Sequence, residues 1–512
     1  MNQGMKPEFL FLADLHAYIL SFLPYQDILR CTSVCRDLHQ TYLSSSELQY
    51  IVELSGQQLL PVDLPLDSHT PTISECLQLL RDKVHAWFKL NTQSIEHVDV
   101  SNKYIMKLTF MSNGHFCLMD DPTLHHHDYL RGPTISKIFP ILQDPSQRVF
   151  DCVWRSDTLS SVPNAQLNDI LMDPTQNLLA AACHILDGPD VYIDILPLDG
   201  DGAHPQAAGT TLCMLPELRG PQNILPKAER WRIRSLGRLM ALSHSLRLND
   251  PVRILWWLQI WDWQHSTTSN SVLSDAMSGS QISIDYYFLG TSRLLAIVDI
   301  NLKVYSIEDM SQAPQLLACF LLPAPDDGAQ SRPPPEMPQK MWKSDPTHRI
   351  ISLNMLPSLH FVISTRIFFE PDFIKGGSTA IPWKHWGSLN TRIFQHCPDI
   401  FYSATGSRVL KVEHAIDATG GNDFLEYSLR VMDFRPLAIK YGQGLGRLVR
   451  EPSTIDLDGQ SLTTSLPYVE VVSSKISNSK DELLLTSIDE NRIYAFHVDG
   501  RFVKVIKIWE GV

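Results

Sequence analysis

The residues of this chain whose types could support chemistry fall into a few short clusters. The segment 125–128 (HHHD) offers metal-ligating side chains. Adjacent residues converge on one ion only in a tight loop, however, and no second ligand set has the spacing of a tetrahedral zinc site. The segment 442–446 (GQGLG) is one residue short of the GxGxxG dinucleotide pattern and lies in no βαβ unit. We interpret both segments as surface loops.

Other clusters indicate packing rather than reactivity. Cys31 and Cys35 lie four residues apart, as on one face of a helix, with no further ligand nearby, and are interpreted as small core residues. The segment 332–338 has the RxxPxxP spacing of polyproline ligands, which arises by chance in proline-rich loops. The tryptophans of segment 256–263 are typical of a packed core with one indole N–H satisfied. With no GxSxG or HExxH motif, the sequence predicts no catalytic residue, no metal site and no cofactor.

Composition excludes several classes of protein. The 512 residues are 44% hydrophobic, which supports a large core and excludes global disorder. The formal net charge of −13 argues against nucleic acid or an anionic membrane as a partner. Nine cysteines, an odd number without framework spacing, indicate reduced thiols. Acidic residues interrupt the apolar start, and no apolar run reaches about 20 residues, so we expect a soluble cytoplasmic or nuclear protein.

The first ninety residues have helical periodicity. Along residues 11–23, apolar side chains recur at steps of three and four, at Leu12, Leu15, Ile19, Phe22 and Leu23. Pro24 ends this helix, and Asp27 is a plausible N-cap for the next. Three short helices spanning about 35–45 residues have too little interior to bury all of these side chains. The pattern therefore implies that another surface covers them, from this chain or from a partner.

Residues 12–40 resemble an F-box. That family's pattern starts with Leu-Pro, continues with an acidic residue, an Ile-Leu pair, Leu-Pro and Asp-Leu-Leu, and ends with Val-Cys-Arg. The matching residues here are Asp14, Leu15, Ile19, Leu20, Leu23, Pro24, Asp27, Ile28, Leu29, Val34, Cys35 and Arg36. The chain departs from the pattern where Phe11, Leu12 and Ala13 replace the first Leu-Pro, and at His16 and Ala17. The missing proline removes a rigid first position for the helix.

The resemblance implies a function. F-box segments dock on the Skp adaptor of a cullin-based ubiquitin ligase, and the rest of the chain captures a substrate. The adaptor would then cover the apolar stripe. The docking set that we expect is Leu12, Leu15, Ile19, Leu20, Leu23, Pro24, Ile28, Leu29, Val34 and Cys35, some of which must also hold the three helices together.

A further helix is predicted at about residues 73–90. Thr72 and Glu75 have capping-box spacing, and apolar residues from Ile73 to Phe88 recur at helical steps. Ala86-Trp87 looks like a feature that follows the box in many fungal F-box proteins. We interpret this segment as a linker helix that packs on the next domain.

Beyond residue 95 the sequence predicts strands. Short runs rich in β-branched and aromatic residues alternate with turn residues over about 415 residues. A β domain of this size must protect its edges, as a propeller or a large sandwich does. The segment 258–263 (LQIWDW) resembles the third strand of a WD-type blade, and segments 283–307 and 482–500 resemble strand triplets. At about 40–60 residues per blade, we expect six to eight blades.

The predicted organisation is therefore α+β and multidomain. An all-α F-box spans 8–55, a linker spans 56–94, and a large all-β, propeller-like domain spans 95–512. Segments 196–226 and 323–347 are predicted loops. The SLPY stretch at 465–468 and the Asp-Glu-x-Arg-Ile pattern at 489–493 resemble the C-terminal parts of fungal F-box proteins, and we expect them to be structural.

The sequence thus predicts a non-catalytic substrate receptor of a Skp–cullin–F-box E3 ubiquitin ligase. Its partners would be the Skp adaptor, cullin through that adaptor, and a protein substrate. One alternative is a propeller scaffold whose degenerate F-box has no ligase role. Another is an enzyme housed in a propeller, against which the absent motifs argue.

Overall fold

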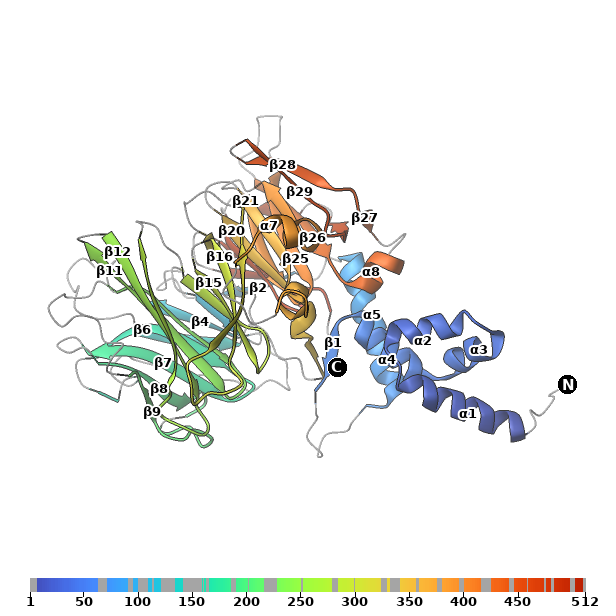
Figure 1. The fold of residues 1–512 in the computed structure, drawn as a ribbon, viewed down its shortest axis with the longest axis horizontal. Coiled ribbons are helices and arrows are strands. Elements are labelled where there is room, and N and C mark those ends of the chain that lie inside the picture. The colour runs from blue at the N-terminus through green and yellow to red at the C-terminus, as the bar shows by residue number, and fades with distance from the viewer. Residues whose placement is uncertain are drawn as a thin grey trace.

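The computed structural model combines N-terminal helices with a large β domain (Figure 1). The order of N-terminal helices followed by a mostly β chain is the one predicted. The described residues are 7–62, 71–90, 95–99, 109–112, 115–120, 134–140, 159, 161–162, 165–185, 190–200, 202–215, 228–249, 252–278, 284–298, 300–323, 329–331, 341–355, 359–374, 380–395, 400–415, 425–441, 446–457, 459–473, 476–479, 483–497 and 502–509.

Four short helices form the N-terminal module. They are α1 (Pro7–Ser21), α2 (Tyr25–Thr32), α3 (Arg36–Ser44) and α4 (Ser46–Gly56). Pro24 precedes α2 in an extended conformation and so separates it from α1, as predicted. Ser45 caps α4, its hydroxyl accepting a hydrogen bond from the Leu48 N–H at 3.3 Å. Leu20, Ile28 and Leu48 are buried and supply the interior of this small module.

The linker contains one strand and one long helix. Strand β1 (Leu59–Pro61) pairs with β19 (Trp342–Ser344) of the β domain. Helix α5 (Ile73–Lys89) begins with the predicted capping box, in which Thr72 and Glu75 bond each other's backbone N–H. It ends at Leu90, whose φ of 41° is left-handed.

In the described part of the chain, seven sheets follow one another along the β domain, all antiparallel except for the parallel pair β17–β22. The first three comprise β3 (Thr109–Ser112), β4 (His115–Asp120) and β5 (Thr134–Pro140); β6 (Ala165–Asp173), β7 (Leu178–Ile185), β8 (Val191–Pro197) and β9 (Thr211–Cys213); and β10 (Ala228–Leu236), β11 (Leu239–Asn249), β12 (Val252–Asp262) and β13 (Ser271–Ser278). The next two comprise β14 (Ile284–Phe288), β15 (Arg293–Val298), β16 (Asn301–Ser306), β17 (Gln315–Leu321) and the short β22 (Ala380–Ile381); and β18 (Ala329–Ser331), β20 (Ile350–Met355), β21 (Leu359–Ser364) and β23 (Thr391–Gln395).

The last two sheets lie nearest the helices. One contains β24 (Ile400–Thr405), β25 (Arg408–Ala415), β26 (Leu425–Asp433), β30 (Tyr468–Val472) and β27 (Arg447–Val449), with β31 (Ile476–Ser479) also paired to β26. The other, which we call the closing sheet, contains β32 (Leu483–Ile488), β33 (Arg492–His497), β34 (Phe502–Lys507) and β2 (Ile95–Asp99). Smaller elements are the hairpin β28 (Ser453–Leu457) and β29 (Gln460–Thr464), helices α7 (Trp383–Asn390) and α8 (Pro436–Tyr441), and 3₁₀ turns η4 (Pro346–His348) and η5 (Thr365–Phe369).

The sheets pack against one another in chain order. First strands of neighbouring sheets are in contact, β3 with β6, β6 with β10 and β10 with β14. Most apolar clusters draw on two consecutive sheets; one joins Leu178 and Ile193 to Leu242 and Trp261, for example. Serial four-stranded meanders packed face to face are typical of propeller-like domains. The predicted third strand with Trp261-Asp262 is indeed the third of its sheet, β12, and segment 283–307 forms the predicted triplet β14–β16. The described residues of segment 482–500 form only β32 and β33, because the third strand, β34, begins beyond the segment at Phe502.

Two segments that were predicted to be loops contain strands. Segment 196–226 includes β9, which pairs with β8, and segment 323–347 includes β18 and β19. Turn-forming residues dominate these segments, so three-residue strands leave no periodic signal in the sequence. The PWKHWG stretch forms the start of α7, with Trp386 buried against the neighbouring core.

Candidate partner-binding surface and the joint behind it

An exposed apolar face runs along α1. Leu15, Tyr18, Ile19 and Phe22 are 43%, 65%, 52% and 70% exposed. Their spacing of i, i+3, i+4 and i+7 places them on one side of the helix and its end. Val34, just before α3, and Leu43, within α3, are 77% and 51% exposed, and α3 is in contact with α1. We call these six residues the apolar face.

The predicted docking set divides into exposed and buried members. Exposed members are Leu15, Ile19, Pro24, Val34 and Cys35. Buried or half-buried members, which hold the helices together, are Leu20, Leu23, Ile28 and Leu29. The side chain of Leu12 lies outside the described residues. Sequence reasoning thus assigned one role to two groups, because the family pattern does not separate core from surface.

Sequence reasoning missed Tyr18, and it placed Phe22 in the apolar stripe but not in the docking set. Tyr18 and Phe22 pack edge to face with ring centroids 4.9 Å apart. Neither position belongs to the F-box pattern quoted above. Their four-residue spacing, in register with Leu15 and Ile19, was the signal that could have identified them.

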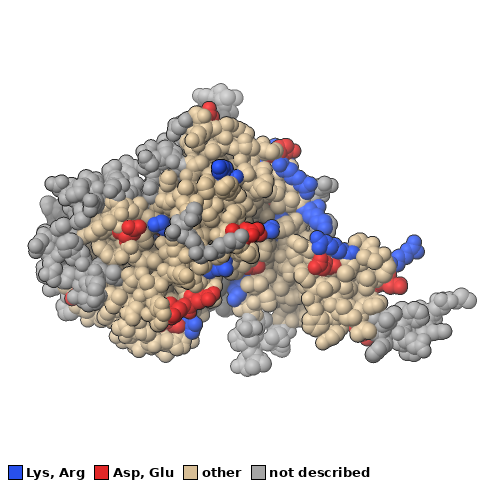
Figure 2. Space-filling view, in the orientation of Figure 1, with Lys and Arg blue, Asp and Glu red and all other residues tan. Residues whose placement is uncertain are grey.

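The helices that carry the apolar face lie on the side of the helical module farthest from the β domain. Figure 1 shows α1 and α3 at the far side of the helical module, with α4 and α5 between them and the sheets. Figure 2 shows that most of the module's surface in this view is uncharged. In this arrangement the β domain does not cover the apolar face.

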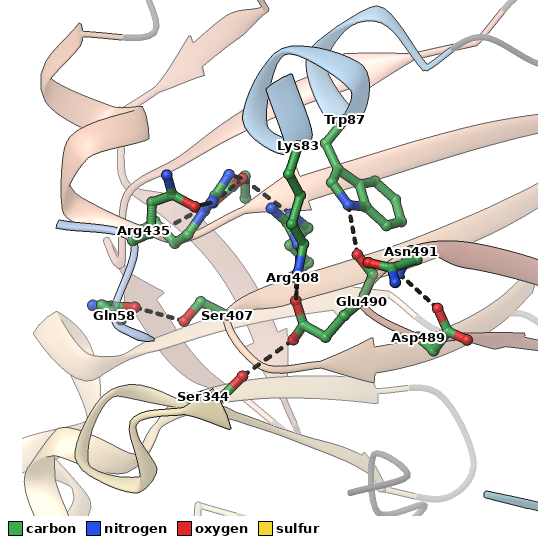
Figure 3. Close-up of polar contacts among 12 residues, drawn as sticks. Gln58, Lys83, Trp87, Ser344, Ser407, Arg408, Arg435, Asp489, Glu490 and Asn491 are labelled. Carbon is green, nitrogen blue, oxygen red and sulfur yellow. Dashed lines mark hydrogen bonds and ion pairs between the residues drawn. The ribbon is translucent and has the colours of Figure 1, made fainter. Parts of the chain in front are cut away.

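A buried interface attaches helix α5 to the β domain (Figure 3). We call this interface the joint; its polar contacts centre on Glu490. Lys83 of α5 donates to the Glu490 carboxylate at 3.3 Å, and the Trp87 indole N–H donates to the Glu490 carbonyl at 2.9 Å. Arg408 reaches the same carboxylate at 3.4 Å and lies over the Trp87 ring. The Ser344 hydroxyl donates to Glu490 at 3.1 Å.

Asp433 completes the charge cluster. It accepts hydrogen bonds from Arg408 at 3.3 Å and from Arg435, whose Nε lies 2.8 Å away. Gln57, just after α4, bonds Arg435 at 3.4 Å, and Gln58 accepts a hydrogen bond from Ser407. We use the name charge cluster for Lys83, Arg408, Asp433, Arg435 and Glu490, which are all nearly fully buried.

The charge cluster contains three cations and two anions, and the pKa values reflect that excess. Burial raises the pKa of Glu490, but Lys83 and Arg408 outweigh burial and hold it at about 2. Burial lowers the pKa of Lys83 to about 8, against the attraction of Glu490 and with the repulsion of Arg408. The folded state therefore strongly favours the ionised forms of Asp433 and Glu490, and it disfavours the charged form of Lys83.

Apolar contacts surround the charges. Trp87, Phe88 and Leu90 belong to a cluster that includes Ile493 and Ile506 of the closing sheet. Leu54, Leu59, Leu80 and Trp342 form a second cluster, and the Trp342 indole N–H donates to the Tyr50 hydroxyl at 3.0 Å. The prediction that the linker helix packs on the next domain is confirmed. So is the structural interpretation of segment 489–493, where Asp489 accepts the N–H groups of Asn491 and Arg492.

One arrangement in the described β domain has the form of a hydrolase triad. The Ser352 hydroxyl lies 3.1 Å from Nε2 of His360, and Nδ1 of His360 bonds Asn354. Ser352 and His360 are buried, and Tyr402 stacks on the imidazole at 3.7 Å. A nucleophile needs access to substrate. We therefore interpret this triad as a satisfied polar network between sheets.

Two cavities lie near the joint, and both are small. One of about 30 Å³ is lined mainly by apolar residues of the last two sheets, including Ile95, Leu429 and Ile506. The other, of about 10 Å³, lies within the charge cluster beside Gln57 and Ser407. Typical ligand pockets have volumes of about 300–1,000 Å³, so neither cavity admits an organic substrate.

The remaining sequence clusters have varied outcomes. Segments 125–128, 332–338 and 442–445 lie outside the described residues. Cys35 is exposed and precedes α3, while Cys31 is half-buried within α2, so the prediction that they share a helix face in the core is wrong. The connection between two helices interrupts the periodicity that linked them.

The tryptophan prediction is confirmed. Trp256, Trp257, Trp261 and Trp263 are all buried, and Trp263 donates to the Gly237 carbonyl at 3.0 Å. Among the described residues, no group of three or more His, Cys, Asp or Glu side chains is arranged to hold a metal ion. No described helix has the length and apolar character needed to cross a bilayer.

Comparisons with known proteins give only a distant likeness. No family model and no curated protein matches the chain. Among solved structures, the WD40 domain of SCAP from fission yeast is 8% identical, with 82% of this chain and 83% of that chain covered and a TM-score of 0.35. BamB from Moraxella catarrhalis is 8% identical (80% and 98% covered, TM-score 0.31), and the β-propeller domain of the Trilobed protease from Pyrococcus furiosus is 10% identical (69% and 97%, TM-score 0.28). At these TM-scores the likeness carries no argument, and the propeller-like description rests on the sheet order above.

Proposed function

We propose that this chain is an F-box substrate receptor of a Skp–cullin–F-box E3 ubiquitin ligase, similar to those of fungi. The observation that carries the proposal is the apolar face of α1, on the segment whose sequence resembles an F-box. An exposed helix face with anchors at i, i+3, i+4 and i+7 suits docking into an apolar groove of another protein. The Skp adaptor would supply that groove.

The β domain would present a protein substrate. We propose that it is a closed propeller with the closing sheet as its seventh blade, because this sheet combines β2, near the N-terminal helices, with the last strands β32–β34. Joining both ends of a β domain in one sheet removes exposed edges. The receptor itself would be non-catalytic and without a cofactor, and would act in the cytoplasm, the nucleus or both.

Co-purification with a Skp adaptor tests the proposal. The full chain should bind the adaptor, and Ile19→Asp should abolish binding because it places a charge in the centre of the contact. Val472→Asp is the matched control, since Val472 is 50% exposed on the β domain and should tolerate the same change. If the wild-type chain does not bind, or if Ile19→Asp binds equally well, the ligase role is refuted and the scaffold alternative replaces it.

A further inference from the structure

The joint and the closing sheet are built from the same short stretch of chain. Helix α5 ends at Lys89, and β2, which pairs with β34, begins at Ile95. Leu90, between them, is buried and adopts a left-handed conformation that is unfavourable for a residue with a side chain. Packing of its side chain must therefore hold the chain in this conformation.

The two features also share one apolar core. Phe88 and Leu90 of the joint lie in the same cluster as Ile506 and Ile508, at and beyond β34, with Ile95 of β2 packed against it. The described residues of α5, β2 and β34 therefore contribute to one apolar cluster. We expect detachment of either α5 or β2 to expose apolar surface of this shared cluster to water.

The polar contacts join the same elements. Glu490 lies in the turn between β32 and β33, where it bonds Lys83 and Trp87. The next residue, Asn491, accepts the backbone N–H groups of Ile508 and Trp509 at 2.9 and 3.1 Å, so the segment after β34 is tied to the same turn. One turn therefore anchors α5 and the end of the closing sheet.

We propose that docking of α5 and pairing of β2 with β34 form a single cooperative unit. The helical module, and with it the apolar face, then has a fixed position only on a chain whose closing sheet is complete. An incompletely folded β domain releases α5, and a disturbed joint loosens the closing sheet. By linkage, the two effects are reciprocal and equal in free energy. This coupling stands independently of which partner the apolar face binds.

Hydrogen exchange on the full chain tests the coupling from the side of the joint. Trp87→Phe keeps a buried aromatic ring but removes the hydrogen bond to Glu490. It should accelerate exchange about fivefold in α5, β2 and β34 together. Trp263→Phe is the matched control, because it removes an equivalent bond to the Gly237 carbonyl in another sheet. It should leave exchange in α5 and the closing sheet unchanged.

The reverse perturbation starts at the closing sheet. β2 lies at the edge of its sheet, and the N–H groups of Glu96 and His97 point to opposite sides of the strand. Of the variants Glu96→Pro and His97→Pro, one therefore removes a backbone hydrogen bond to β34 and the other does not. Glu96→Ala is the control for loss of the ion pair between Glu96 and Lys507, which are 3.3 Å apart. The bond-breaking proline should accelerate exchange in α5 as much as in β34. Acceleration of one element without the other, or of neither, overturns the proposal.

Discussion

Two substitutions within the charge cluster should have opposite consequences for stability. Glu490→Gln leaves three buried cations facing Asp433 alone. Lys83→Met leaves Arg408 and Arg435 facing Asp433 and Glu490, a neutral set, and keeps an unbranched apolar side chain at the position. The charge balance predicts that the first variant is strongly destabilised and that the second is not.

The pKa values set the magnitudes. Glu490 is nearly fully buried, and a pKa held at about 2 instead of 4.5 corresponds to about 3 kcal/mol in favour of its carboxylate. This agrees with the roughly 3–5 kcal/mol lost when one partner of a buried ion pair is removed. For Lys83, a pKa of about 8 instead of 10.5 means that its charged form is disfavoured by a similar amount. We therefore expect Lys83→Met to lie within about 1 kcal/mol of the wild type, or above it.

Urea unfolding at pH 7, followed by tryptophan fluorescence, measures both variants. Glu490→Gln should lose about 3 kcal/mol of unfolding free energy, and the double variant should recover much of that loss, because it removes one of the unbalanced cations. Comparable losses in Lys83→Met and Glu490→Gln would refute the reasoning. They would show that Lys83 is a required counter-ion rather than an excess charge.

Three further predictions follow from the same structure. The pKa of Lys83 is lower in the folded state than in the unfolded state, so the unfolded chain binds more protons than the folded chain between pH 8 and 10.5. The unfolding free energy of the wild type should therefore rise across that range relative to that of Lys83→Met, as measured by urea unfolding at several pH values. Ile28→Ala should destabilise the helical module by about 2–5 kcal/mol in thermal melts, whereas Leu15→Ala should leave melting unchanged and weaken adaptor binding in calorimetry. A chain of residues 95–512 should aggregate on expression, whereas residues 46–512, which retain α4, β1 and α5, should remain monomeric in size-exclusion chromatography.

Sequence reasoning succeeded where local patterns decide the structure. The capping box at Thr72 and Glu75 is set by residues three positions apart, and helix α5 begins where it predicts. The tryptophan-rich strand at 252–262 is recognisable because its apolar run is long and dense. The exposed face of α1 was predicted as an apolar stripe for the same reason, although Tyr18 was not included in it.

The joint could not be predicted from the sequence. Lys83 and Glu490 are 407 positions apart, and nothing local distinguishes either from a solvated surface charge. β1 and β19 are three residues long and are defined only by pairing with each other. The predicted boundary at residues 94 and 95 separates α5 from β2, although residues of both pack in one apolar cluster. Tertiary structure, rather than composition, makes α4, β1 and α5 part of the β domain's packing.

The chemistry of the joint suits orientation better than stability. Apolar packing of Trp87 and Phe88 alone would be non-directional and would tolerate several angles of α5 on the sheets. Hydrogen bonds from Lys83, Trp87 and Ser344 converge on the single residue Glu490, and their geometry is satisfied in one orientation. Burying an unbalanced cation weakens the folded state, yet any other orientation would leave buried charges unpaired at a larger cost. We infer that the cluster selects one position of the apolar face relative to the β domain. The proposed receptor role would require this, because it needs partner and substrate to be held at a fixed separation.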